Sequence, residues 1–161
     1  MERQTPKPGQ ESVWDYPRPP RQEAVDHHIE VFFEDKLIAD TVDARRVLET
    51  SHPPSYYLPR DDVDMSSFRP SKHRTFCEFK GVATYYDLVV GDRVLTNVAW
   101  TYEDPTPDFA AITGHLAFYP SHFDCYLDGD SVRPQPGGFY GGWITDNIVG
   151  PFKGVPGSQG W

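Results

Sequence analysis

A Pro-rich segment of this sequence, residues 49–59, brings a carboxylate, an imidazole and two phenols close together in the chain. Glu49 and His52 are residue types that act as general bases, and Tyr57 offers an aromatic ring with a hydroxyl group. Loops of this composition form the rims of ligand pockets, although Pro-rich connections with stacked tyrosines also serve simply as covers. Both interpretations stay open from the sequence.

The segment 75–80, Thr-Phe-Cys-Glu-Phe-Lys, carries a thiol and an ammonium group. Cys77 is either a nucleophile or a buried, inert thiol. Lys80 can bind a carboxylate, a phosphate or a carbonyl oxygen, or it can pair with a neighbouring glutamate. A regular strand places Cys77 and Lys80 on opposite faces, but Gly81 favours a turn that directs the ammonium into a cavity.

Aromatic strands beside these segments supply the rest of a ligand site, because pockets combine aromatic walls with a few convergent polar groups. We expect a small polar or anionic molecule to bind between the sheets, in a pocket lined by Glu49, Tyr57, Cys77, Lys80, Tyr85 and Trp100. One alternative is an enzyme of unassigned class, with Glu49 or a histidine as general base and Lys80 stabilising negative charge. Another is a protein-interaction module that uses the terminal arms.

Metal and cofactor chemistry finds little support in the residue spacing. The six histidines form no His-x-His or His-x-x-x-His pair, and two cysteines, Cys77 and Cys125, are too few for a four-thiolate zinc site. The Gly-rich run 137–143 lacks the Lys-Ser or Lys-Thr of a phosphate-binding loop, so close packing of the chain explains it better. We therefore expect neither metal ligands nor a cofactor.

Charge and composition exclude further classes of partner. The 161 residues carry 15 Lys and Arg against 24 Asp and Glu, a net charge of −9, which disfavours nucleic acid and anionic membranes. Only residues 69–93 are net positive, which offers one landing place for a small anion unless these charges are merely solvated. The chain shows neither an apolar run of membrane-spanning length nor a signal peptide, so we expect a cytoplasmic protein, monomeric or homodimeric.

Three segments read as β-hairpins, because β-branched and aromatic runs flank polar or Gly-containing turns. They are 28–40 turning at Glu34-Asp35, 82–100 turning at Gly91-Asp92, and 125–132 turning near Asp128-Gly129. In the second, the register pairs Val90 with Arg93, Val89 with Val94, Leu88 with Leu95 and Tyr85 with Val98.

That register gives the second hairpin two apolar faces. One face carries Tyr85, Val89, Val94, Val98 and Trp100, and the other carries Val82, Tyr86, Leu88, Val90 and Leu95. A ribbon of this kind needs cover on both sides, so the sequence predicts a mainly β fold with two antiparallel sheets in a sandwich or tent-like arrangement.

Helices are expected to be few and short, at 43–49 and 108–112. We expect one domain over residues 1–161, with about 1–12 flexible. The segments 13–22 and 134–161 should be extended arms that pack on the core, because water is a poor environment for their tryptophans.

Several motifs resemble the family called domain of unknown function 427. They are Trp14-Asp-Tyr-Pro-Arg-Pro-Pro20, Val47-Leu-Glu-Thr-Ser-His-Pro-Pro54, Tyr57-Leu-Pro59, Thr75-Phe-Cys-Glu-Phe-Lys-Gly81, Tyr85-Tyr86, Ala99-Trp100 and Leu116-Ala-Phe-Tyr-Pro120. Residues 134–143 and 150–154 resemble longer members, so the likeness covers nearly the whole chain.

The resemblance implies a β-tent-like domain in which two antiparallel sheets lean together. Better-known relatives of this fold carry a structural zinc on paired Cys-x-x-Cys motifs, which this sequence lacks. Aromatic packing should replace that zinc, through Tyr85, Tyr86, Trp100, Phe118 and Tyr119 filling the wedge between the sheets. The family carries a nucleotidyltransferase label, but this chain shows neither paired acidic metal ligands nor a Gly-Ser phosphate loop.

Overall fold

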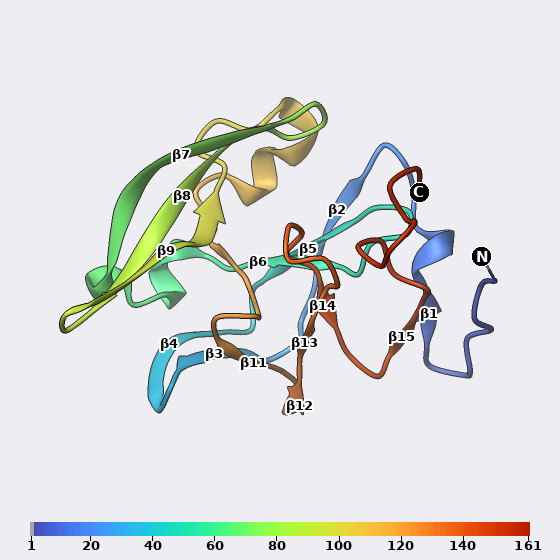
Figure 1. Cartoon of the computed structure of the whole chain (residues 1–161), viewed down its shortest axis with the longest axis horizontal. Coiled ribbons are helices and arrows are strands. Elements are labelled where there is room, and N and C mark those ends of the chain that lie inside the picture. Colours follow the sequence, from blue (N-terminus) through green and yellow to red (C-terminus); the bar gives the residue numbers. More distant parts are fainter. Residues whose placement is uncertain (1) are drawn as a thin grey trace.

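A computed structural model describes residues 2–161 and shows a mainly β protein with short 3-10 helices (Figure 1). The strands are β1 (Glu11–Ser12), β2 (Arg21–Ala24), β3 (Ile29–Phe33), β4 (Lys36–Thr41), β5 (Arg45–Leu48), β6 (Ser55–Tyr57), β7 (Phe68–Cys77), β8 (Gly81–Val90), β9 (Arg93–Thr101), β10 (Ala117–Phe118), β11 (Asp124–Leu127), β12 (Asp130–Ser131), β13 (Arg133–Pro134), β14 (Trp143–Ile144) and β15 (Ile148–Val149). The helices are η1 (Val13–Asp15), η2 (Arg60–Asp62), η3 (Met65–Ser67) and η4 (Pro107–Ile112).

Two four-stranded antiparallel sheets form the body of the domain. Their strand orders are β10-β9-β8-β7 and β12-β11-β3-β4. A three-stranded antiparallel sheet, β2-β5-β6, lies beside them, and two small ribbons pair β1 with β15 and β13 with β14. Figure 1 shows the long strands β7, β8 and β9 leaning over β3, β4 and β11, with the terminal segments gathered at the other end of the molecule. The predicted sandwich-like β architecture is confirmed.

All three predicted hairpins form at the predicted turns. Glu34-Asp35 joins β3 to β4, Gly91-Asp92 joins β8 to β9, and Asp128-Gly129 joins β11 to β12. Gly91 and Asp128 have positive φ angles, a conformation that Gly and Asp tolerate in tight turns, and Glu34 adopts a positive φ at the same place in its turn. Local turn chemistry therefore fixes these connections.

The β8–β9 register follows the prediction near the turn and departs from it farther away. Leu88 pairs with Leu95 as expected, but Tyr85 pairs with Trp100 instead of Val98. The cause is a bulge, in which Asn97 has φ +55° and its N–H donates to the buried Asp87 carboxylate at 2.8 Å.

The bulge changes which side chains share a face. Val98 joins Leu88 in the main core and leaves the face that carries Tyr85 and Trp100. The main core lies between the two four-stranded sheets and draws on both of them, with fully buried side chains that include Ile29, Val31, Leu88, Val98 and Phe118.

The opposite face of the ribbon packs in a second cluster with Tyr57, Tyr85, Trp100, Tyr102 and Phe109. The expectation that five aromatics fill one wedge is therefore wrong. Phe118 and Tyr86 belong to the main core, whereas Tyr85, Trp100 and Tyr119 lie on the other side of the sheet. Alternation along the strands separates these side chains, because neighbouring residues point to opposite faces.

One predicted helical turn is a strand. Residues 45–48 form β5, which pairs with β2 on one side and β6 on the other. This tertiary pairing overrides the weak capping signal of Asp43. The second predicted helical segment, 108–112, lies within η4.

The terminal segments make extensive contacts with each other and with the domain. Val13 is buried in a third cluster with Leu48 and Ile144, and Trp143 is buried in the main core. Near the N-terminus, β1 pairs with β15 and the backbone N–H of Gln4 donates to the Gly150 carbonyl. No helical segment of residues 2–161 has the length and apolar character that a bilayer crossing requires.

Candidate functional site

A cavity of about 630 Å³ lies on the face of the β10-β9-β8-β7 sheet opposite the main core. Its walls come from β5 and β6, from β7, β8 and β9, and from the C-terminal segment around Gln135 and Lys153. Three parts of the chain that are remote in sequence thus enclose one space.

The six predicted residues all line this cavity: Glu49, Tyr57, Cys77, Lys80, Tyr85 and Trp100. The structure also shows why Cys77 and Lys80 line the same cavity, although a regular strand would place them on opposite faces. Strand β7 ends at Cys77, and Lys80 follows in a turn instead of continuing the strand. Gly81 has φ +107°, a conformation that glycine adopts readily, so the chain reverses and both side chains reach the same cavity.

Lys80 is a half-buried cation that lines the cavity. Thr106 holds its turn, because the Thr106 N–H donates to the Lys80 carbonyl and the Thr106 hydroxyl donates to the Phe79 carbonyl. The Lys80 Nζ lies 5.9 Å from the ring centroid of Tyr102, within cation–π range. Burial opposes its charge, yet the pKa of Lys80 is raised by the Tyr57 phenol, the Cys77 thiol and the Glu49 carboxylate. The side chain is therefore a charged ammonium at neutral pH.

Two tyrosines, Tyr57 and Tyr102, line the same cavity. Tyr57 is 2% exposed and accepts a hydrogen bond from the Trp100 indole N–H at 3.2 Å, which leaves its own O–H free to donate. Tyr102 is 5% exposed, and its hydroxyl has no hydrogen-bond partner among residues 2–161. Burial raises the pKa of both phenols, so each is neutral and a donor.

The remaining wall of the cavity is aromatic, and some of its hydroxyl groups hydrogen-bond to each other. The hydroxyl groups of Tyr85 and Thr75 lie 3.0 Å apart and form a hydrogen bond. The Tyr119 ring packs on Trp100 with 4.6 Å between centroids. These contacts hold the wall in one arrangement, which is the support that a preorganised binding site needs.

Glu49 and His52 face each other at one side of the cavity. The Glu49 carboxylate lies 3.3 Å from the Arg18 guanidinium and 3.7 Å from His52 Nε2. Burial lowers the pKa of His52 to about 4, even though Glu49 acts in the opposite direction. His52 is therefore neutral at pH 7.

The C-terminal segment closes the cavity, and its glycines explain how. A Cβ at Gly141 would lie 2.2 Å from the Trp100 ring, and a Cβ at Gly142 would lie 2.5 Å from the Gln135 Oε1 atom. Only glycine permits this approach of backbone to side chain. The Gly-rich run thus serves close packing, as its sequence suggested, and Phe139 and Tyr140 between the glycines line the cavity mouth.

Sequence reasoning missed several lining residues, notably Tyr102, Tyr119, Gln135, Tyr140 and Lys153. Tyr102 lay within reach, because it follows Trp100 by two positions and strand alternation places both on one face. No local pattern marks Gln135, whose contact with His52 spans 83 positions of sequence.

Residues 21–129 match a family described as Domain of unknown function (DUF427). The chain belongs to the DUF427 family. No curated protein matches it. The family match covers β2 through β11 and so most of the cavity wall, whereas Gln135, Tyr140 and Lys153 come from the segment beyond it.

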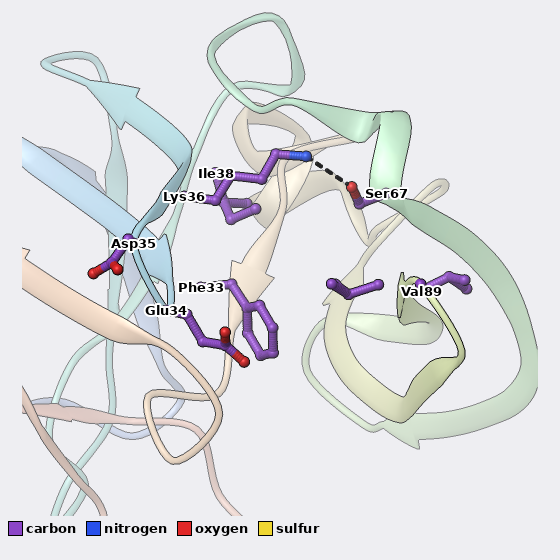
Figure 2. Close-up of a pocket in the computed structure, with 9 residues that line it drawn as sticks. Phe33, Glu34, Asp35, Lys36, Ile38, Ser67 and Val89 are labelled. Atoms are coloured by element: carbon purple, nitrogen blue, oxygen red, sulfur yellow. Dashed lines mark hydrogen bonds between the residues drawn. The ribbon is translucent and has the colours of Figure 1, made fainter.

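A second hollow of about 600 Å³ in this DUF427 protein lies where the tips of the β3–β4 and β8–β9 hairpins approach each other (Figure 2). Two of its three charged side chains, Glu34 and Lys36, already have partners. Lys36 Nζ donates to the Ser67 hydroxyl at 3.0 Å, and Glu34 pairs with Arg93. None of the six predicted residues lines it.

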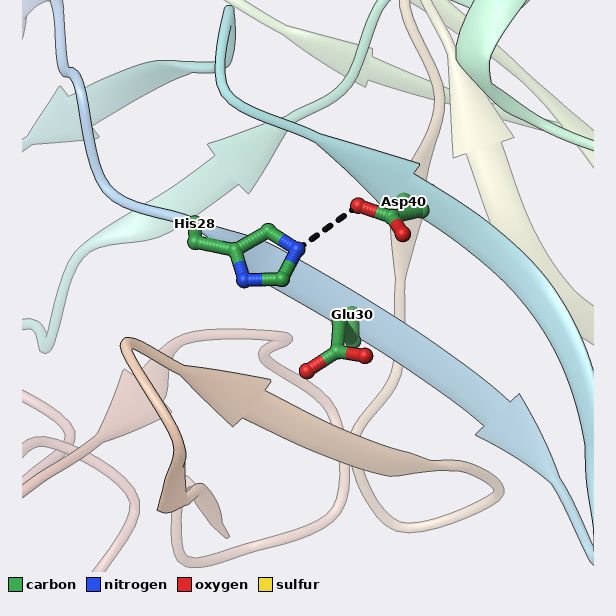
Figure 3. A group of neighbouring side chains, drawn as sticks. All are labelled: His28, Glu30 and Asp40. Carbon is green, nitrogen blue, oxygen red and sulfur yellow. Dashed lines mark hydrogen bonds and ion pairs between the residues drawn. The ribbon is translucent and has the colours of Figure 1, made fainter.

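A trio of potential metal ligands lies on the solvent side of β3 and β4 (Figure 3). The ligand atoms of His28, Glu30 and Asp40 lie within 4.8 Å of one another. The His28 Nε2 atom already hydrogen-bonds Asp40 at 2.7 Å, and this bond raises the pKa of His28. The DUF427 domain thus uses this histidine as a partner for a carboxylate across two paired strands.

Proposed function

We propose that this protein binds a small, oxygen-rich anion in the aromatic cavity. The observation that carries the proposal is a set of hydrogen-bond donors left without acceptors. Lys80 forms no ion pair within residues 2–161, and the Tyr102 hydroxyl, on a residue that lines the cavity, has no hydrogen-bond partner in that same part of the chain. Donors that face a cavity gain free energy from a ligand or water that accepts from them. With the free O–H of Tyr57, these groups form a converging donor trio.

The charges that line the cavity favour a single negative group on the ligand. Arg18 neutralises Glu49, and the Lys153 ammonium donates to the carbonyl oxygens of Gln159 and Trp161. Lys153 keeps its positive charge in these contacts, so Lys80 and Lys153 together exceed the remaining lining anion, Glu78, by one charge. A carboxylate on a flat body fits one ammonium and aromatic walls better than a doubly charged phosphate does.

The alternatives receive less support. In the enzyme alternative Glu49 or a histidine is the general base, but Glu49 pairs with Arg18 at 3.3 Å, and burial lowers the pKa of His52 to about 4, which makes it a weak base. An interaction module would need free arms, whereas Val13 and Trp143 are buried against the domain. The binding function therefore uses the strongest features of the site.

The test is a thermal-shift and calorimetric screen of the full chain against benzoate, other small carboxylates, inorganic phosphate and the neutral amides of the same acids. A carboxylate at 100 times its dissociation constant should add about 2.7 kcal/mol to the free energy of unfolding. We expect Lys80→Met to abolish this gain. Lys72→Met, an exposed change on β7, the strand that precedes the Lys80 turn, is the matched control and should keep it.

Tyr102→Phe removes one hydroxyl group and leaves the ring in place. Loss of one hydrogen bond to a charged group should weaken binding roughly tenfold. Equal binding of benzoate and benzamide, or unchanged carboxylate binding by both cavity variants, would refute the donor trio as the site.

A further inference from the structure

Gln135 makes three contacts that fix the orientation of its side-chain amide. Its Oε1 atom accepts a hydrogen bond from the Gly142 N–H at 3.1 Å. Its Nε2 atom donates to the Lys153 carbonyl at 2.9 Å and lies 3.2 Å from His52 Nδ1. Turning the amide over would place two oxygens against each other at Lys153 and two N–H groups against each other at Gly142. The contacts therefore permit one orientation.

This orientation determines where His52 carries its proton. The Gln135 Nε2 atom has two hydrogens, of which one goes to Lys153 and the other faces His52 Nδ1. An imidazole nitrogen accepts a hydrogen bond only when it is unprotonated. The proton of a neutral His52 must then lie on Nε2, the atom 3.7 Å from the Glu49 carboxylate.

We infer that Gln135 is a positioning residue that holds His52 as the neutral Nε2–H tautomer, so that His52 is a hydrogen-bond donor to the bound anion and not a general base. The basic nitrogen of His52 is occupied by Gln135, which leaves nothing on that ring to accept a substrate proton. The identity of the acceptor rests on the proposed function, whereas the tautomer rests on the contacts of Gln135 alone.

The surroundings of His52 favour the neutral ring. Arg18, Lys80 and Lys153 oppose a positive charge on it, burial does the same, and Glu49 alone favours the charge. The Tyr140 ring packs against the imidazole edge-on, with 4.8 Å between centroids. Burial and the nearby cations therefore both favour a neutral His52 imidazole.

The experiment is a long-range ¹H–¹⁵N correlation spectrum of the full chain, labelled at histidine nitrogens, at pH 7 and without added ligand. His52→Gln identifies the signal, and the expected pattern is that of the Nε2–H tautomer. A Nδ1–H pattern or an imidazolium would overturn the inference.

Gln135→Glu tests the positioning role directly. A carboxylate accepts but cannot donate, so the His52 proton should move to Nδ1 or the ring should become charged. Its pKa should then rise by about one unit or more. An unchanged tautomer in this variant would also overturn the inference, and the His115 signal serves as internal control.

If Gln135→Glu does not fold, Gln135→Met decides, because it removes the donor without adding charge. The expected result is a mixture of tautomers, and a retained Nε2–H pattern counts against a role for Gln135. These spectra need no ligand, so their outcome is independent of whether benzoate or another carboxylate binds through Lys80.

Discussion

The β8–β9 ribbon has two apolar faces, and the rest of the molecule covers each of them differently. On one face, Leu88 and Val98 are fully buried between the two four-stranded sheets. On the other face, Tyr85 and Trp100 are equally part of a hydrophobic cluster, yet they border a cavity of about 630 Å³. The first face is closed by a core of aliphatic and aromatic side chains, and the second is lined by aromatic rings whose polar groups border the cavity.

Under the proposed function, one pair of strands serves stability with one face and recognition with the other. Most side chains of the core face fill space without polar atoms, although the buried Thr101 hydroxyl has no hydrogen-bond partner among residues 2–161. Tyrosines fill space equally well but bring hydroxyl groups, and Tyr102 keeps one such group without a partner in the described residues. A sheet face rich in tyrosine and tryptophan is therefore where a ligand gains the most from binding.

Truncating a side chain on the core face should have the largest effect on the free energy of unfolding. Leu88→Ala should lower the free energy of unfolding by about 2–5 kcal/mol, because it removes a fully buried side chain and leaves a cavity. Tyr85→Phe on the cavity face should cost only about 0.5–1.5 kcal/mol, the contribution of its hydrogen bond to Thr75. Urea denaturation of both variants decides, and equal losses would contradict the division of roles.

Acid titration sharpens the comparison, because the cavity face holds the titrating group. The folded pKa of His52 is about 4, below the unfolded value near 6.5, so the unfolded chain binds more protons between these pH values. Stability should therefore fall as the pH drops from 6.5 towards 4, by a total on the order of 2–3 kcal/mol for this group.

The measurement is the free energy of unfolding against pH for the wild type, His52→Gln and Leu88→Ala. His52→Gln should flatten the profile between pH 6.5 and 4, whereas Leu88→Ala should shift it down in parallel. Below that range Glu11 contributes as well, because its hydrogen bond to Arg46 lowers its pKa and is lost on protonation. Parallel profiles for the wild type and His52→Gln would show that His52 titrates normally.

Local signals explain which parts of this fold could be predicted from the sequence. The three hairpins were predictable because each turn is set by two or three adjacent residues. The pairing of Tyr85 was not, because the bulge depends on a hydrogen bond between Asn97 and Asp87 across the two strands. Residues 45–48 became a strand for the same reason, since β2 and β6 supply partners that no local pattern shows.

The candidate site likewise contains residues that the sequence could predict and residues that only the tertiary structure reveals. Residue type predicted Tyr57 and Trp100 as site residues, and the turn expected at Gly81 added Lys80; the structure places all three around one cavity. Their binding of a ligand stays a prediction. The contribution of Gln135 depends on a chain segment that folds back over the domain after its last long strand. Only the tertiary structure brings it to His52.

Treatment with a chelator should have the smallest effect, because packed side chains cover both faces of the ribbon. A structural zinc contributes on the order of 10 kcal/mol in small domains, so a bound ion would be evident when a chelator removes it. In residues 2–161, His28, Glu30 and Asp40 are the trio whose ligand atoms converge, and they belong to the solvent side of β3 and β4. We expect purified protein to contain no stoichiometric zinc and its Tm to stay unchanged in EDTA. One tightly held zinc per chain, lost in His28→Ala together with several degrees of Tm, would instead make that outer surface a third stabilising region. The aromatic face would then no longer be the replacement for a metal anchor.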